Sequence, residues 1–356
     1  MPISSDLLND WVEDPESYFL SDLNCNAEEY IGAAAQSLYL ALIESKVGRP
    51  LVVPLLLSMI NDLSAQNCAF HSEIERISGE VTPYANENIL LWDAIYLAIG
   101  VSANILTPNY QFEDWFKICL GPNLAKLMEV KSSKNFLPIL KRRILWMIGC
   151  HANLITSSTN AHSLLVMSLI QNQSNSENDL AVKLTAASSL ISIFYEPTFD
   201  KLLLSTDAAT LIKSLYEIFA FCEELESRRM IMELISLVLG IYCGGELSNE
   251  AANTAVIPLL EIWNLSGGHN ILRKEVLGVL NCIVAAVGSE RLGLLDSIVG
   301  PMLCQSLDQK NKNDSMFLIE DALSLWLSIL RLSCTYTSTL DNLFIFASTM
   351  GMEYIR

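Results

Sequence analysis

The chain has 356 residues, of which 51% are hydrophobic and 17% are charged. A composition this apolar supports a large buried core and excludes an intrinsically disordered chain. The 22 Lys and Arg residues against 40 Asp and Glu residues give a net charge of −18, which disfavours bulk binding to nucleic acid because the phosphates would be repelled.

The beginning of the chain is strongly acidic. Its first 45 residues contain nine acidic residues and no Lys or Arg. Secretory signals and mitochondrial presequences need basic residues, so we expect no such leader here. The stretch from Asp6 to Glu29 is a candidate contact for a basic protein partner. The alternative is that the charge only keeps an apolar chain soluble. The candidate contact residues are Glu13, Asp14, Glu16 and Asp22.

The remaining chain shows helical spacing of apolar residues and lacks the alternation and Asn-Gly or Asp-Gly turns of β-hairpins. We therefore predict an all-α fold. Residues 68–87 form the longest polar stretch and are predicted to be an irregular loop. One series of helices carries a proline that we expect to kink the first helix of each pair, at Pro54, Pro122, Pro258 and Pro301.

The segment 136–149 is the most informative helix. Its proline lies where a helix begins, and three cations follow in an early turn, at Lys141, Arg142 and Arg143. Cations at a helix start oppose the helix dipole, so we expect them to contact a neighbouring segment. Similar early cations recur 40 to 46 residues apart, at Arg143, Lys183, Arg229 and Arg273. This period is typical of HEAT or armadillo repeats.

We therefore predict a right-handed α-solenoid of HEAT/ARM-type helical hairpins, with 1–356 as a single array. Its predicted repeats span about 1–67, 88–129, 137–172, 179–222, 228–264, 270–307 and 316–356. The residues expected to hold neighbouring repeats together are Asp93, Arg142, Arg143, Trp146, Asp179, Lys183, Arg229, Arg273 and Trp326.

The sequence lacks recognisable catalytic, cofactor and metal motifs. It has no phosphate-binding loop, no Gly-x-Ser-x-Gly and no His-Glu-x-x-His. The nine cysteines are scattered, which disfavours a disulfide framework or a cysteine zinc site. His151 and His162 straddle a predicted turn, but structural histidines are the better interpretation. The longest charge-free span, 144–176, is interrupted by polar residues, so we expect no membrane insertion. Because no catalytic constellation is recognisable, we also expect no enzyme.

Five segments occur in an order that resembles the importin-β-type karyopherins. They are Trp11–Glu16, Leu91–Tyr96, Phe112–Phe116, Lys141–Gly149 and Phe317–Trp326. The resemblance is to the middle of the family's solenoid. The family's N-terminal region that binds the GTPase Ran has no counterpart, and Cys150-His151 stands where the family tends to have Gln-Trp.

The resemblance implies a nuclear transport receptor, or a piece of one, that carries protein cargo and shuttles between nucleus and cytoplasm. Ran and Phe-Gly nucleoporins would be its other partners, with the Ran site outside this chain. HEAT arrays also organise protein complexes unrelated to transport, so a structural scaffold subunit is the alternative function. Neither function requires a cofactor.

Overall fold

The computed structural model describes most of the chain, and every regular element in it is a helix. The described residues are 5–23, 31–78, 87–130, 137–170, 180–199, 208–242, 247–267, 269–287, 296–307 and 312–332. No strand occurs among these residues, which confirms the all-α prediction. The chain divides into two compact units, residues 1–206 and 207–356, where the sequence predicted one continuous array. Each unit is described by itself.

Unit 1 contains twelve α-helices and three short helical turns among its described residues. The α-helices are α1 (Ser5–Glu13), α2 (Pro15–Leu23), α3 (Ile31–Glu44), α4 (Arg49–Ala65), α5 (Asn67–Ser78), α6 (Glu87–Val101), α7 (Ala103–Leu106), α8 (Phe112–Trp115), α9 (Gly121–Glu129), α10 (Leu137–Cys150), α11 (Thr159–Ile170) and α12 (Leu180–Phe194). The turns are the 3₁₀ segments η1 (Thr107–Asn109) and η3 (Ala152–Leu154) and the π-helix η2 (Phe116–Leu120).

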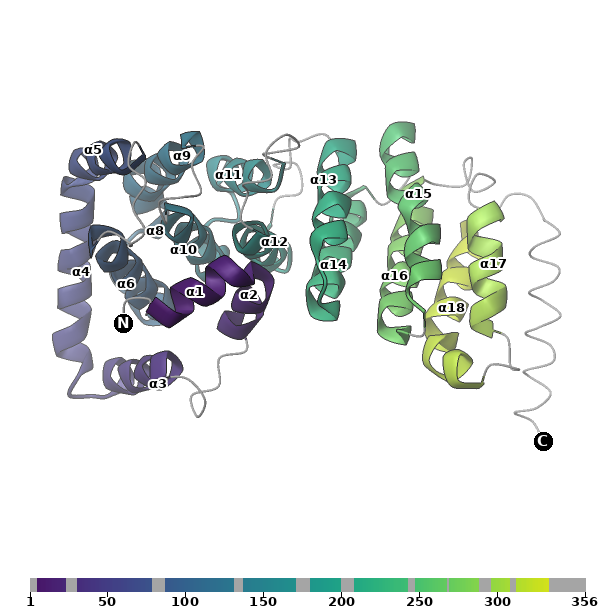
Figure 1. Ribbon diagram of the computed structural model, residues 1–356, viewed down its shortest axis with the longest axis horizontal. Coiled ribbons are helices and arrows are strands. Elements are labelled where there is room, and N and C mark those ends of the chain that lie inside the picture. The colour runs from purple at the N-terminus through teal and green to yellow at the C-terminus, as the bar shows by residue number, and fades with distance from the viewer. Residues whose placement is uncertain are drawn as a thin grey trace. The chain divides into compact units, whose positions relative to one another are not determined.

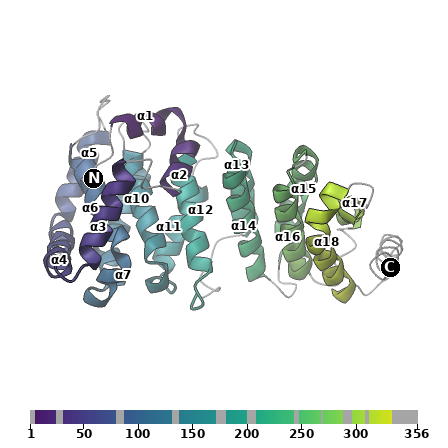
Figure 2. The same cartoon turned by 90° about the horizontal axis from the view of Figure 1, so that it is seen from below.

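Two rows of helices build the body of unit 1 (Figures 1 and 2). In one row α10 lies between α6 and α12 and contacts both. In the other row α9 contacts α5 and α11. The contacts of α9 with α10 and of α11 with α12 join the rows. Each helix buries its apolar stripe between the rows, which is the arrangement expected of stacked helical pairs.

The hairpin formed by α1 and α2 lies outside this order. Although it comes first in the chain, α2 contacts α12, the last helix of the row, and both views show the two side by side (Figures 1 and 2). Trp11 and Phe19 are buried beneath the hairpin, while Val12 points to solvent. The beginning of the chain is therefore folded back over the helix row.

Unit 2 consists of stacked helical pairs. The described residues of this unit form α13 (Ala208–Phe221), α14 (Leu225–Ile241), α15 (Asn249–Leu265), α16 (Asn270–Val287), α17 (Asp296–Leu307) and α18 (Lys312–Leu332). One row is α14, α16 and α18, and α13 contacts α15 in the other. Polar contacts join successive pairs: Tyr216 Oη donates to the Ala255 carbonyl at 2.7 Å, and Trp263 Nε1 donates to Gln305 Oε1 at 2.7 Å. The prediction of stacked helical pairs is thus confirmed within each unit.

The predicted repeat boundaries differ from those in the structure. Contacts pair α13 with α14, α15 with α16 and α17 with α18, whereas predicted repeats such as 228–264 and 270–307 join each uninterrupted helix to the one after it. The early cations mark the start of each uninterrupted helix, and each predicted repeat was therefore begun there. In the structure this helix is the second of its pair. The region 1–67 also differs, because its described residues form four helices rather than one pair.

The predicted loop 68–87 is wrong over its first half. Residues 67–78 form α5, and residues 79–86 lie outside the described residues. Phe70, Ile74 and Ile77 are all buried, and their spacing of four and three residues marks one face of a helix. The polar residues between them face solvent and hid this pattern in the sequence.

Three of the four prolines lie within helices, as predicted: Pro54 in α4, Pro258 in α15 and Pro301 in α17. Pro122 lies where the π-helix η2 passes directly into α9, and Leu120 and Gly121 at this junction both have helical dihedral angles. A proline at this place removes one backbone donor from a continuous helical run.

Among the described residues, no single helix has both the length and the apolar composition to cross a membrane. Residues 87–101 and 103–109 would pass together, but a 68° bend separates them.

Two glycines let α10 approach both of its neighbours. A Cβ added at Gly100 in α6 would lie 2.2 Å from Cζ3 of Trp146, and one at Gly149 in α10 would lie 2.7 Å from Oγ of Ser189 in α12. Ser189 Oγ also donates to the Leu145 carbonyl at 2.8 Å. Both positions are therefore closed to larger side chains.

We expect G100A and G149A each to lower the free energy of unfolding by about 1–3 kcal/mol, as overpacking does elsewhere. Gly32 in α3 is the matched control, since a Cβ there meets nothing within 4 Å. G32A should be neutral or stabilising by up to about 1 kcal/mol. Urea unfolding of the three variants measures this, and equal effects at all three positions would contradict the close approach.

Candidate functional site

Helix α10 carries two adjacent buried arginines near its start. Pro138 is tolerated in the first turn, and the apolar residues that follow keep α10 in the core. Arg142 and Arg143 are only 2% and 3% exposed. Two buried cations in the first half of a helix are unfavourable both for the helix dipole and for desolvation. Each must therefore have a partner of opposite charge.

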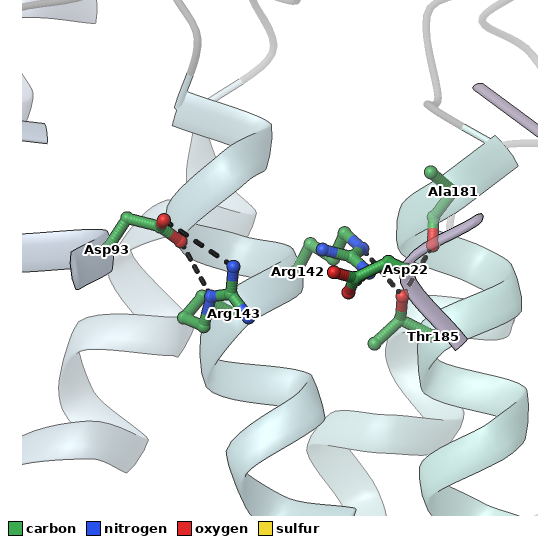
Figure 3. A network of polar contacts seen from close by, with 6 residues as sticks. All are labelled: Asp22, Asp93, Arg142, Arg143, Ala181 and Thr185. Carbon is green, nitrogen blue, oxygen red and sulfur yellow. Dashed lines mark hydrogen bonds and ion pairs between the residues drawn. The ribbon is translucent and has the colours of Figure 1, made fainter. Parts of the chain in front are cut away.

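Arg143 pairs with the preceding helix of the row. Its Nε donates to Oδ1 of Asp93 in α6 at 2.7 Å, and its Nη2 lies 3.5 Å from Oδ2. Asp93 is fully buried. The guanidinium also lies over the Trp146 ring, 5.1 Å from its centroid. The Asp93–Arg143 pair therefore joins α6 to α10 inside the core (Figure 3).

Arg142 points to the other side, toward α12 and α2 (Figure 3). Its Nε donates to Thr185 Oγ1 at 3.1 Å, and the Thr185 hydroxyl donates in turn to the Ala181 carbonyl at 2.8 Å. Its Nη2 forms a short ion pair with Asp22 of α2. One guanidinium thus connects α10, α12 and the N-terminal hairpin.

Two aromatic rings of the hairpin complete the surroundings of Arg142. Its guanidinium carbon lies 5.6 Å from the centroid of Trp11 and 5.1 Å from that of Tyr18. The two rings contact each other with centroids 4.8 Å apart. Rings at these distances attract a cation through their quadrupoles. We call Trp11, Tyr18, Asp22, Arg142 and Thr185 the Arg142 cluster.

The pKa values of this region favour the charged pairs. Burial raises the pKa of the Asp22 carboxyl, but the charges of Arg142 and Arg143 and the hydrogen bond from Arg142 outweigh burial and leave this pKa below its ordinary value. For Arg143, burial lowers the pKa, but Asp93 and Asp22 outweigh it and raise the pKa above its ordinary value. Burial raises the pKa of the Tyr18 hydroxyl to about 12. Asp22 and Arg143 are therefore charged at neutral pH.

The structure places the other predicted inter-repeat residues as follows. Lys183 is half-buried in α12. Arg229 pairs with Glu226 of its own helix, with Nη2 2.7 Å from Oε1. Arg273 is buried, with its guanidinium 5.2 Å from the Trp263 centroid and its Nε 3.0 Å from Ser266 Oγ. Trp326 is buried in α18, and Asp179 lies outside the described residues.

The structure divides the predicted acidic contact into inner and outer residues. Asp22 is paired with Arg142, and Glu16 is only 5% exposed. Asp14 Oδ1 accepts from the Ser17 backbone N–H at 2.9 Å and so caps the start of α2. Glu13 is exposed. Of the four candidates, Glu13 is thus the one that faces solvent without a structural task in the described contacts.

A second polar cluster surrounds His151 at the end of α10. Because the Met147 carbonyl can only accept, His151 Nδ1 donates to it at 2.9 Å, and Nε2 accepts from Tyr110 Oη at 2.6 Å. The ring stacks on Phe112 with centroids 3.8 Å apart. Burial lowers the pKa of His151 from 6.5 to about 4, despite the hydrogen bond to Met147. His151 is thus a neutral structural histidine.

The structure shows no metal centre in the part of the chain it describes, since no three His, Cys, Asp or Glu side chains gather there. The polar clusters join helices, and their charged groups are paired with one another. Their arrangement positions segments of the chain relative to one another.

The sequence of this chain is similar to the sequences of two known proteins. Over 350 residues, which is 96% of this chain, the sequence is 24% identical to one curated protein of Mus musculus and, to the same extent, to one of Homo sapiens. Both proteins are importin-11. The likeness to importin-11 confirms the predicted resemblance to importin-β-type karyopherins. The chain spans about a third, 32%, of the length of importin-11. No protein-family profile matches the chain, and no solved structure matches it.

Proposed function

We propose that the chain is a portion of a nuclear transport receptor of importin-β type and binds protein cargo. The observation that carries this proposal is the likeness to importin-11, which runs through 96% of the chain and includes both structural units. Stacked helical pairs offer extended surfaces on which a protein partner can be bound over a large area. Shuttling between nucleus and cytoplasm, and contact with Ran and with Phe-Gly nucleoporins, belong to the same proposal.

The outer face of the N-terminal hairpin is the proposed contact for basic cargo. Asp10 and Glu13 of α1 are both exposed, and no Lys or Arg occurs within the first 45 residues to neutralise them. Surface charges of one sign raise the association rate of a partner of opposite charge. The inner acidic residues are excluded from this role, because Asp22 is held by Arg142.

Reversing the two outer charges tests this contact. We expect D10K/E13K to bind a fluorescently labelled core histone dimer, chosen as a strongly basic nuclear protein, several-fold more weakly at low salt, and to flatten the salt dependence of binding. The matched control is E44K/D62K, which changes the net charge equally at two other exposed positions of unit 1. Equal affinities of wild type, test variant and control would contradict the proposed contact.

A further inference from the structure

The N-terminal hairpin is attached to unit 1 across an unusually long stretch of the sequence. The helices of the two rows contact neighbours that are close in the chain or one repeat away. Asp22 and Arg142, in contrast, are 120 residues apart. The row has its own bond between α6 and α10, the Asp93–Arg143 pair, so it does not depend on the hairpin for that contact.

Three contacts of the hairpin converge on one side chain. Trp11, Tyr18 and Asp22 all contact Arg142. The hairpin holds the two rings together itself, since they touch each other, and Asp14 caps α2 from within it. The hairpin thus presents two rings and a carboxylate to a single cation, and the packing of α2 against α12, with Phe19 and Glu16 buried, adds to its attachment.

The charge of the hairpin is complementary to that of Arg142. The hairpin, residues 5–23, has six acidic residues and no Lys or Arg. Beneath it, α10 contributes Arg142, whereas the charge of Arg143 is balanced by Asp93. An acidic helical segment thus supplies the carboxylate that balances Arg142.

We propose that the face of α10 and α12 around Arg142 is a binding site for an acidic helical segment with two aromatic side chains, and that the hairpin is its built-in occupant. A partner segment of this chemistry takes the place of the hairpin on this face. The proposal does not rest on the transport-receptor function.

The chemistry of the partner follows from the burial of Arg142. Its side chain is 3% exposed, and Thr185 satisfies only its Nε. Leaving a buried cation without its carboxylate is strongly unfavourable, so the site is unstable when empty. The occupant must therefore bring a carboxylate for Nη2 and apolar or aromatic surface for the guanidinium faces.

The test uses the full chain and a labelled peptide of residues 5–23. In W11A/Y18A the attached hairpin loses both rings while the face of α10 and α12 is unchanged. We expect this variant to bind the peptide at least about ten-fold more tightly than wild type, in which the attached hairpin competes at high effective concentration. Adding R142Q should abolish the gain, and a peptide of scrambled sequence should not bind.

A second variant guards against loss of the fold. D22K places a cation against Arg142 and keeps both rings, and it should open the site to the peptide in the same way. Equal peptide binding by wild type and both variants, or binding that R142Q leaves intact, would overturn the proposal. Failure of both variants to fold, judged by circular dichroism, would overturn it too, because the hairpin would then be an integral part of the core. A wild-type dimer that the peptide dissociates would assign the site to the hairpin of a second copy and would overturn the foreign partner.

Discussion

Replacing Asp93 by alanine is expected to lower the free energy of unfolding of unit 1 by about 3–5 kcal/mol, because it leaves the Arg143 cation buried without its carboxylate. The pair is inaccessible to water, with side-chain exposures of 4% for Arg143 and 1% for Asp93. R143A should cost a similar amount by stranding the carboxylate. The apolar double variant D93L/R143M should recover most of the loss, since removing both charges also removes the cost of burying them.

Tryptophan fluorescence during urea unfolding measures this effect in unit 1 alone. The chain has six tryptophans, and only Trp263 and Trp326 lie in unit 2, so a W263F/W326F background restricts the signal to unit 1. The control is K117A, which removes the exposed Lys117–Glu113 pair and should change little because such pairs are screened by water. A D93A effect as small as that of K117A would contradict a structural role for the buried pair.

Acidification is expected to destabilise unit 1 through His151. Its pKa is about 4 in the folded chain and 6.5 ordinarily, so between these values the unfolded chain binds a proton that the folded chain does not. Stability therefore falls as pH drops from about 6.5 to about 4, by up to about 3 kcal/mol for this group, and is unaffected by it above that window. The lowered pKa of His162 acts in the same direction.

The variant H151Q separates this effect from other titrations. It loses stability at all pH values, because the contacts with Tyr110 and Phe112 are weakened, but its unfolding free energy should depend less on pH between 6.5 and 4 than that of wild type. H269Q changes an exposed histidine of unit 2 and should keep the wild-type slope. Identical slopes for H151Q and wild type would show that His151 is not held neutral by burial.

Periodicity in the sequence predicted the helices of the rows well but could not predict the contacts that cross them. Asp93 and Arg143 are 50 residues apart, close to one repeat, and both were expected to join repeats. The repeat period also led to the uninterrupted helices α10, α12, α14 and α16. Local spacing thus carries information about neighbours in an array, because each repeat contacts the next.

The Arg142 cluster was only partly predictable. Arg142 and Asp22 were both singled out, but for separate roles, and Trp11, Tyr18 and Thr185 were not assigned to the site. Nothing in a repeat period connects residues 120 positions apart. The sequence contained only a local signal for this contact. The acidic hairpin with its two aromatic residues has no basic residue of its own, and the buried cations Arg142 and Arg143 require carboxylates. Matching these two needs would have brought the segments together.

The boundaries of the loop and of the helical pairs were predicted wrongly because they depend on packing between helices. Composition assigned α5 to a loop, although three buried residues define its face. The role of the glycines could not be predicted from the sequence either. Gly100 is required only because Trp146 of another helix packs against it. Side-chain needs that arise from packing between helices cannot be read from one helix alone.

The most direct test of the transport-receptor account is retention on Phe-Gly repeats. The purified chain, with helical folding verified by circular dichroism, is passed over immobilised Phe-Gly nucleoporin repeats and over the same repeats with every Phe changed to Ser. A portion of a transport receptor should be retained on the Phe-Gly repeats and pass freely over the Ser-Gly repeats. Free passage over both would contradict the account and favour a structural scaffold.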